Sequence, residues 1–334
     1  MTAMVRRSEA GSMLGKAFTV KLCRNNCAAG DGRRRMITLR IVTCSWSAMS
    51  TVTAVVDAHV HIHACYEPDE LLGNAYANLS ENGLAPAGSD VLAGSEALFL
   101  LMTECAGDDY FGALYERAQG REDIHGLSLK HWVITPTDEE VSVVATSASS
   151  NGGPSRRLFI VAGAQIACRE GLEVLVLGTR RRVPDGRPIR EVLTESDSWG
   201  VPRVIPWGPG KWLFRRGRLL QQLVEEFRKP TLFLGDEGGR PIFWSYPQHF
   251  GSAARLGVRD LPGTDPLPFP HDVKKVGRMG FRVRIELDPA RPGSSLLGVL
   301  RQQSTALERF AVLESPLRFV RNQIGMQLRK HRLA

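Results

Sequence analysis

From Val52 onward, strand-like and helix-like segments alternate along the chain. The expected strands are short and rich in Val, Ile and Leu, and cover residues 52–56, 98–102, 130–135, 141–146, 158–166, 172–177, 203–205, 231–234 and 258–261. The expected helices show one apolar face or an acidic first turn, and cover residues 68–79, 108–117, 189–195, 217–229, 246–256, 294–310 and 316–330. This alternation is typical of an α/β protein with a largely parallel sheet.

The order of the segments predicts a (β/α) TIM-like barrel, with a seven-stranded or distorted form as one option. The runs 130–135, 141–146 and 158–166 follow one another without a helix and are separated by turn-forming residues, which indicates a β-meander insertion. The segments 294–310 and 316–330 are expected to be two C-terminal helices. In such a barrel the functional site lies at the carboxyl ends of the strands.

The positive charge is concentrated at the N-terminus. The chain carries a formal charge of +8, and residues 1–50 hold nine Lys or Arg against Glu9 and Asp31, which leaves about +1 for the rest. We interpret residues 1–50 as a disordered basic extension and residues 51–334 as one barrel domain. The extension could instead be a transit peptide, or translation could start at Met49, so that residues 1–48 are not part of the protein.

The near-neutral body argues against a surface that follows a phosphate backbone, so we expect no nucleic-acid partner for the folded domain. No apolar stretch approaches the roughly 18 residues that a membrane-spanning helix needs. The six cysteines form no Cys-x-x-Cys pair, which disfavours a zinc ribbon and a disulfide framework. We therefore expect a cytoplasmic protein.

The motif Asp57-x-His59-x-His61 directly follows the apolar run 52–56. Successive side chains of a strand point to opposite faces, so alternate histidines share one face. Neutral imidazole is a common ligand for zinc and other transition metals. A strand that ends in this way could supply two ligands to a metal ion, whereas His63 has no spacing partner and is interpreted as structural.

Other polar residues follow expected strands and would converge on the same end of a barrel. They are Glu104, Gln165, Glu170, the segment Trp207-Gly208-Pro209-Gly210-Lys211, Asp236-Glu237 and Asp265. Two imidazoles with two or three carboxylates would suit Zn²⁺ or Mn²⁺. A metal ion there would acidify a water enough for it to act as a nucleophile near neutral pH.

The motif Asp57-x-His59-x-His61 resembles the opening metal motif of the amidohydrolase superfamily and of the related polymerase-and-histidinol-phosphatase (PHP) domains. Thr264-Asp265 is similar to the last-strand aspartate of those families. The segments 163–166 and 170–178 resemble a PHP pattern of Gly-x-Glu followed by a strand that ends in His and Leu-Gly. The resemblance implies a metal-dependent hydrolase in which Asp265 is a metal ligand or a proton acceptor.

The chain departs from that pattern at several positions. Gln165 stands in place of a ligand glutamate, and Leu175, Trp207 and Leu267 stand where these families place histidines. A three-metal site is therefore incomplete, and a site for one or two metal ions is what the sequence supports. Gln165 can coordinate a metal through its carbonyl oxygen, but it adds no negative charge.

We therefore predict a metal-dependent hydrolase of the amidohydrolase/PHP type, which uses Zn²⁺ or Mn²⁺ to hydrolyse a phosphoester, amide or ester bond of a small anionic substrate. The expected roles are catalytic for Asp265 and Glu104, metal binding for His59, His61, Asp265 and Asp236, and substrate binding for Gln165, Trp207, Lys211 and Arg215.

Simpler explanations exist for some of these residues. Asp265 and Asp236 also suit turns, Trp207 suits a core, and Lys211 suits a solvated helix start. An alternative function is a non-catalytic ligand- or partner-binding protein with an incomplete metal site. A third is a regulator of anionic polymers that acts through the basic extension. The sequence leaves the substrate, the number of metals and the oligomeric state open.

Overall fold

The computed structural model describes residues 49–83, 96–121, 127–148, 155–244 and 246–333. By its contacts the chain divides into two units, Met1–Ala48 and Met49–Ala334. Residues 1–48 of the expected basic extension therefore lie outside the described residues. The account below concerns the second unit.

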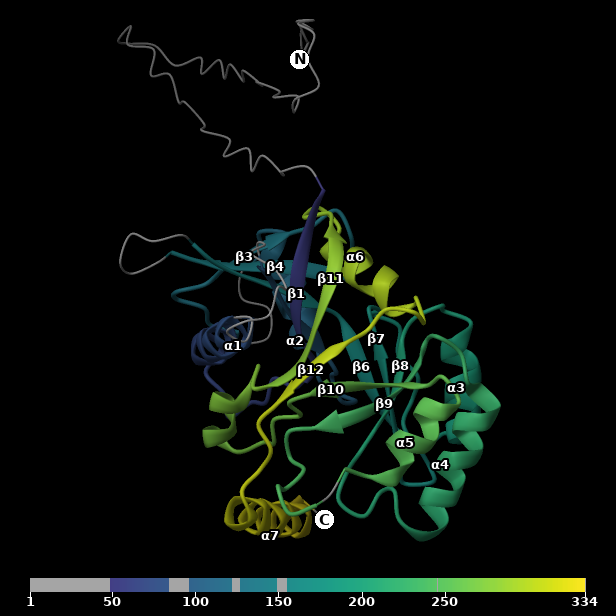
Figure 1. Ribbon diagram of the computed structural model, residues 1–334. Helices are drawn as coiled ribbons and strands as arrows, with labels where there is room; N and C mark the ends of the chain where they lie inside the picture. The colour runs from purple at the N-terminus through teal and green to yellow at the C-terminus, as the bar shows by residue number, and fades with distance from the viewer. Residues whose placement is uncertain (1–48, 84–95, 122–126, 149–154, 245, 334) are drawn as a thin grey trace, which may run out of the picture. The chain divides into compact units, whose positions relative to one another are not determined.

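The strands of this unit form two mixed sheets (Figure 1). The seven-stranded sheet has the order β12-β11-β1-β2-β5-β4-β3, with bounds β1 Ser50–Val60, β2 Glu96–Met102, β3 Val133–Pro136, β4 Ser142–Ser147, β5 Arg156–Val161, β11 Met279–Leu287 and β12 Glu308–Ala311. The five-stranded sheet has the order β10-β9-β8-β7-β6, with bounds β6 Gly163–Ala167, β7 Glu173–Leu177, β8 Arg203–Pro206, β9 Leu232–Glu237 and β10 Arg259–Gly263.

The predicted TIM-like barrel is wrong. In the described part of the chain no closed barrel exists, because β1 pairs antiparallel with β11 at the edge where a barrel would need β10. On its other side β1 pairs parallel with β2, and β2 pairs parallel with β5. In the second sheet β8, β9 and β10 are parallel, whereas β6, β7 and β8 are antiparallel. The molecule is an α/β fold of two sheets.

Helices flank both sheets, and the one at Pro292–Leu300 contributes Leu296, Leu297 and Leu300 to the core between the sheets. The helices are α1 Pro68–Gly83, α2 Tyr110–Ala118, α3 Ile189–Asp197, α4 Phe214–Phe227, α5 Gln248–Arg255, α6 Pro292–Leu300 and α7 Pro316–Leu333, with a 3₁₀ helix η1 at Pro270–Lys275. Figure 1 shows α3, α4 and α5 along one side of the five-stranded sheet. Their apolar faces pack with Ile205, Leu232 and Leu234 in one core cluster.

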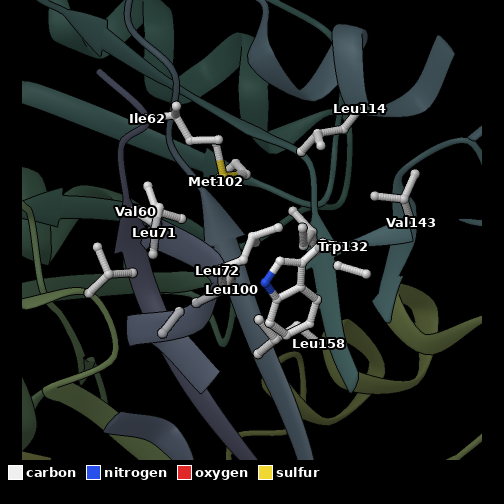
Figure 2. Close-up of a cluster of buried hydrophobic side chains, with 14 of the residues drawn as sticks. Val60, Ile62, Leu71, Leu72, Leu100, Met102, Leu114, Trp132, Val143 and Leu158 are labelled. Atoms are coloured by element: carbon white, nitrogen blue, oxygen red, sulfur yellow. The ribbon is translucent and has the colours of Figure 1, made fainter. Parts of the chain in front are cut away.

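Two further apolar clusters lie on the two faces of the seven-stranded sheet. One packs α1 and α2 against β1, β2, β4 and β5. Figure 2 shows part of this cluster, with Leu72, Leu100 and Trp132 among the labelled side chains. The other lies between the sheets and combines Val56 and Phe99 with residues such as Leu177 and Phe233 of the five-stranded sheet. Burial of apolar area at about 25 cal/mol per Å² holds these layers together.

Near the C-terminus the structure differs from the expected elements. Residues 279–287 form β11, which the sequence reading missed, although Phe281, Val283, Ile285 and Leu287 are buried and alternate with polar residues. The expected helix 294–310 ends at Leu300, and residues 308–311 form the edge strand β12 instead. These two strands occupy the edge of β1 and prevent the barrel.

Candidate metal centre

The two sheets meet at the carboxyl ends of β1 and β2. The backbone N–H of Asp265, just after β10, donates to the carbonyl of His59 at 2.8 Å. The N–H of Gln165 in β6 donates to the carbonyl of Glu104 at 2.8 Å. At both junctions a glycine permits the approach, because a Cβ on Gly263 would overlap His59, and one on Gly163 would overlap the carbonyl oxygen of Met102. The ends of these strands, which carry the polar residues, are thereby brought together.

A bulge in β1 aims the histidines at the second sheet. The register between β1 and β2 shifts between Asp57 and Val60. Before the shift, Val56 and Ala58 face the core between the sheets, and after it Val60 and Ile62 face the helix α1 side. Because the alternation changes phase there, His59 and His61 point to the sheet junction.

His59, His61 and Asp265 form a compact cluster. The Nε2 atoms of His59 and His61 lie 3.0 Å apart, and each lies 3.5 Å from Oδ1 of Asp265. The Oε1 atom of Gln165 lies 3.0 Å from Nε2 of His59. The two histidine side chains are 3% and 5% exposed, whereas that of Asp265 is 25% exposed, so solvent reaches the cluster from the side of Asp265.

The donor set fits a divalent cation. One ligand atom from each of His59, His61 and Asp265 lies within 4.8 Å of the others. Ligands at 2.0–2.1 Å from one tetrahedral ion are roughly 3.3 Å apart, close to the separations in the cluster. Asp265 also adopts a left-handed backbone conformation with φ of 47°, which is uncommon for a residue other than glycine and frequent at functional sites.

Glu237 lies behind His59. Its Oε1 atom is 3.4 Å from Nδ1 of His59, and both atoms are buried without a hydrogen-bond partner in the described part of the protein. A carboxyl group at the second nitrogen of a ligand histidine fixes the tautomer and leaves Nε2 for a metal. Buried polar atoms rarely lack a hydrogen-bond partner. A bound metal ion that draws His59 and Glu237 closer together would explain why these two atoms lack one here.

The electrostatics of the cluster favour a cation. Burial by itself lowers the pKa of His59, but the acidic groups of Asp265 and Glu237 outweigh burial and raise it to about 9. Burial and the charge of His59 lower the pKa of His61 to about 3. Burial opposes ionisation of Asp265, yet the two histidines hold its pKa below its usual value. One positive charge is therefore stabilised between these groups, and a metal ion would compete with the proton for that position.

Asp57 of the same motif is a structural residue. Its buried carboxylate accepts hydrogen bonds from the backbone N–H groups of His59, Thr264 and Gly277 at 3.2, 2.8 and 2.8 Å, and from the Thr264 hydroxyl. Burial raises its pKa to about 6 although these donors act in the opposite direction. Asp57 thus ties the end of β10 to β1 and sets the position of Asp265.

Two predicted acidic residues lie outside the cluster. Glu104 accepts from the backbone N–H of Phe111 at 2.6 Å, near the start of α2, and pairs with Arg182. Asp236 is fully buried and pairs with Arg240 and Arg309. Both carboxylates are therefore engaged by other groups of the protein.

The predicted substrate-binding residues also separate. Gln165 belongs to the cluster, whereas the Nζ atom of Lys211 pairs with Glu173, and its charge contributes to lowering the pKa of Asp265. Trp207 is 2% exposed, and its ring packs edge-on against Trp244 in the core under α3–α5. Arg215 is exposed on α4.

Glu237 was named with Asp236 among the polar residues expected to converge but was given no role, although alternation along β9 could have assigned one. Phe233 faces the core between the sheets, and Leu232 and Leu234 face the helices. Continuing this period of two places Glu237 with Phe233, toward His59, and Asp236 on the opposite face.

No protein-family model matches the chain, and no curated protein matches it. Solved structures that are similar to it include PsfC and two endonucleases. PsfC from Pseudomonas syringae PB-5123 is 17% identical with a TM-score of 0.44, and the match covers 86% of this chain and 100% of that one. The lesion-specific endonuclease PfuEndoQ from Pyrococcus furiosus is 10% identical with a TM-score of 0.41, over 78% of this chain and 58% of that one.

The third is an Endonuclease Q complex with a 27-mer duplex carrying an abasic lesion, at 12% identity and a TM-score of 0.38, over 72% of this chain and 56% of that one. The chain thus spans little more than half of either endonuclease chain. The expectation of no nucleic-acid partner for the folded domain conflicts with these endonuclease neighbours and is not retained. Membership of the PHP or amidohydrolase superfamily stays a hypothesis.

Among the described residues, no helix combines the length and the apolar character needed to cross a bilayer.

Proposed function

We propose that this protein is a metal-dependent hydrolase of the amidohydrolase/PHP type, with His59, His61 and Asp265 as metal ligands. The observation that carries the proposal is the convergence of two imidazole nitrogens and one carboxylate oxygen within 4.8 Å, at a position whose electrostatics favour a cation. Zn²⁺ and Mn²⁺ both suit this mixed set of nitrogen and oxygen donors.

The residues of the chain have distinct roles in this proposal. When bound, the metal ion supplies Lewis acidity that activates water near neutral pH. Glu237 orients His59, and Asp57 holds the loop that carries Asp265. Asp265 is the ligand that solvent reaches, so it is the group best placed to accept the proton of the attacking water.

The positive charge of Lys211 favours a small anionic substrate. Its ammonium group pairs with Glu173, and its positive charge contributes to lowering the pKa of Asp265. An anionic group such as a phosphoester or a carboxylate would be attracted to it. The proposed reaction is hydrolysis of a phosphoester, amide or ester bond next to that group. We expect Lys211→Ala to raise KM more than it lowers kcat, and equal losses would contradict a purely binding role.

Metal content tests the ligand assignment directly. Protein purified without chelators is expected to carry about one Zn²⁺ or Mn²⁺ per chain in elemental analysis by ICP-MS, and the His59→Ala/His61→Ala variant less than about 0.2. His63→Ala is the matched control, because His63 follows on the same segment but bonds the carbonyl of Pro266 and lies outside the cluster. Unchanged metal content in the double variant would refute the assignment.

Turnover is tested with phosphomonoester, phosphodiester, lactone and amide substrates in the presence of Zn²⁺ or Mn²⁺. Asp265→Asn, which keeps a residue tolerant of the left-handed conformation, is expected to lower kcat at least roughly 100-fold. Glu104→Gln separates the two predicted proton acceptors. A comparable loss in Glu104→Gln, with a normal thermal midpoint, would assign the proton to Glu104, whereas a lower midpoint with nearly normal kcat fits its contacts with Arg182 and Phe111.

A non-catalytic binding protein is the second candidate. It is favoured by Gln165, whose neutral amide oxygen occupies a position beside His59 where a carboxylate would add charge. Metal binding without turnover above the His59→Ala/His61→Ala background in any assay would establish this alternative over the hydrolase.

A further inference from the structure

A cationic cleft lies between η1 and the first half of α7. Its volume is about 420 Å³, and it is lined by His271, Lys274, Lys275, Arg278, Arg318 and Arg321. The two elements are joined by packing of Phe269 against Gly325 and by a contact between Arg321 and His271 at 3.0 Å. All the side chains that line the cleft can carry positive charge, so it fits an anionic group.

Part of this charge has acidic partners within the protein, and one of them is Asp272, which lies 3.3 Å from His271. Lys275 pairs with Asp272 and Glu314, and Arg318 lies 3.7 Å from Glu314. Lys274 and Arg278 are exposed and have no ion pair in the described part of the chain. The two acidic groups are buried beneath the cleft, so the surface that faces solvent remains cationic.

An exposed apolar stripe runs along the same helix. Leu317, Val320, Ile324 and Leu328 are between 50% and 83% exposed, and their spacing of three, four and four residues places them on one face of α7. The opposite face of α7 is packed, because Asn322 is buried there and Phe319 contacts Phe243 edge-on. A contiguous apolar surface of this kind marks an interaction site.

The composition of α7 limits what can cover the stripe. Residues Pro316–Leu333 contain no Asp or Glu but include Arg318, Arg321 and Arg329. On a helical wheel Arg321 and Arg318 flank the apolar stripe on the side of the cleft. A second copy of the protein docked face to face would bring the positive charges of the two helices together. A nucleic acid would contact the arginines but would leave the apolar side chains without an apolar partner.

We propose that α7 and the adjacent cleft dock on the surface of an anionic lipid bilayer. The apolar stripe enters the interface between head groups and acyl chains, while Arg318 and Arg321 remain at the level of the phosphates. The cleft accepts a lipid phosphate near Lys274 and Arg278. An amphipathic helix with a cationic flank has the two attractions that interfacial binding requires. This inference does not depend on the metal centre.

Vesicle co-sedimentation of the full chain tests the proposal. Binding is expected with vesicles of 70% phosphatidylcholine and 30% phosphatidylglycerol, and much less with pure phosphatidylcholine. Leu317→Ser/Ile324→Ser should weaken binding about tenfold or more through lost apolar burial. Lys274→Gln/Arg278→Gln should weaken it by a similar factor through lost attraction to the anionic surface, without breaking an ion pair of the described protein.

Matched controls keep these outcomes interpretable. Val133→Ser removes an apolar side chain of 62% exposure from β3, and Arg157→Gln/Arg284→Gln removes two exposed charges from β5 and β11. Both are expected to leave vesicle binding unchanged. Each variant is checked for a normal circular dichroism spectrum and thermal midpoint.

Three results would overturn the proposal. The first is vesicle binding that is equal in Leu317→Ser/Ile324→Ser, in Lys274→Gln/Arg278→Gln and in their controls. That result would place the lipid-binding surface elsewhere on the chain. The second is a dimer in light scattering that Leu317→Ser/Ile324→Ser dissociates. The third is binding of a 27-mer DNA duplex that depends on Lys274 and Arg278 but not on Leu317 and Ile324, with no binding to vesicles.

Discussion

Two adjacent carboxyl groups at the end of β9 have opposite environments. Asp236 is held by Arg240 and by Arg309 of β12, whereas Glu237 lies 3.4 Å from Nδ1 of His59 at the sheet junction. The alternation of side chains along a strand is the cause. Of these two neighbouring residues, Asp236 therefore stabilises the fold, and Glu237 serves the candidate site.

Asp236→Asn is expected to lower the free energy of unfolding by about 3–5 kcal/mol, because it leaves two arginines beside a buried position without a counter-charge. Metal content should stay normal in the molecules that remain folded. Asp260→Asn is the control, since Asp260 pairs with Arg309 at 3.2 Å where both side chains are about one-third exposed, and such pairs contribute at most about 1 kcal/mol. Urea denaturation of both variants measures the difference; equal losses would contradict the structural role of Asp236.

Burial also controls thiol reactivity. Cys168 is 6% exposed, and burial raises its pKa to about 12. Because the thiolate is the nucleophile, alkylation of Cys168 should be very slow at pH 8 and rise roughly tenfold per pH unit up to that pKa. Cys65 is exposed and should react before Cys168. Peptide mass spectrometry after timed iodoacetamide treatment compares the two sites, and a pH-independent rate at Cys168 would argue against this environment.

At the scale of elements, β1 and β10 create the site together. The bulge in β1 turns His59 and His61 toward the five-stranded sheet, and the loop after β10 places Asp265 against them. Gly263 permits the backbones to approach, because any side chain there would overlap His59. The geometry of the candidate ligands therefore depends on a backbone contact between two sheets.

Gly263→Ala is expected to reduce metal content and to destabilise the protein by about 1–3 kcal/mol, since the added methyl group forces β10 away from His59. Gly298→Ala is the matched control in α6, where a Cβ meets nothing within 4 Å and helix propensity predicts a gain of about 0.5–1 kcal/mol. Thermal melts and ICP-MS test both variants. Normal metal content in Gly263→Ala would show that the site tolerates separation of the strands.

At the scale of the whole unit, the candidate ligands join two sheets that are linked, among the described residues, by the single β-bridge between Glu104 and Ala164 and by a few backbone hydrogen bonds. The seven-stranded sheet supplies His59 and His61, and Asp265 follows the last strand of the five-stranded sheet. A metal ion bound here would stabilise the junction, because it binds the folded arrangement and not the separated strands.

Addition of Zn²⁺ or Mn²⁺ to chelator-treated protein is therefore expected to raise the thermal midpoint by several degrees. A ligand at 100 times its Kd contributes about 2.7 kcal/mol. His61→Ala should abolish the shift, whereas His63→Ala should retain it. Differential scanning fluorimetry with matched Mg²⁺ controls measures the effect. A shift of the same size in His61→Ala would locate the stabilising metal at another site.

The local sequence pattern was sufficient to predict much of the secondary structure of this molecule. The segments expected between residues 52 and 261 overlap helices and strands of the structure, and the spacing of His59 and His61 predicted their shared orientation. These features depend on neighbouring residues only, through the periods of 2 and 3.6. The alternation at 279–287 was equally local and was overlooked.

The arrangement of the elements was decided by contacts that no local pattern encodes. Whether β1 pairs with β10 or with β11 depends on competition between strands more than 200 residues apart, and β11 occupies that edge. For the same reason Asp236 and Glu237 could not be assigned from residue type, since their partners Arg309 and His59 are distant in sequence. Strand periodicity and the histidine spacing follow from the chain itself, whereas the open pair of sheets and the set of groups around His59 follow from long-range packing.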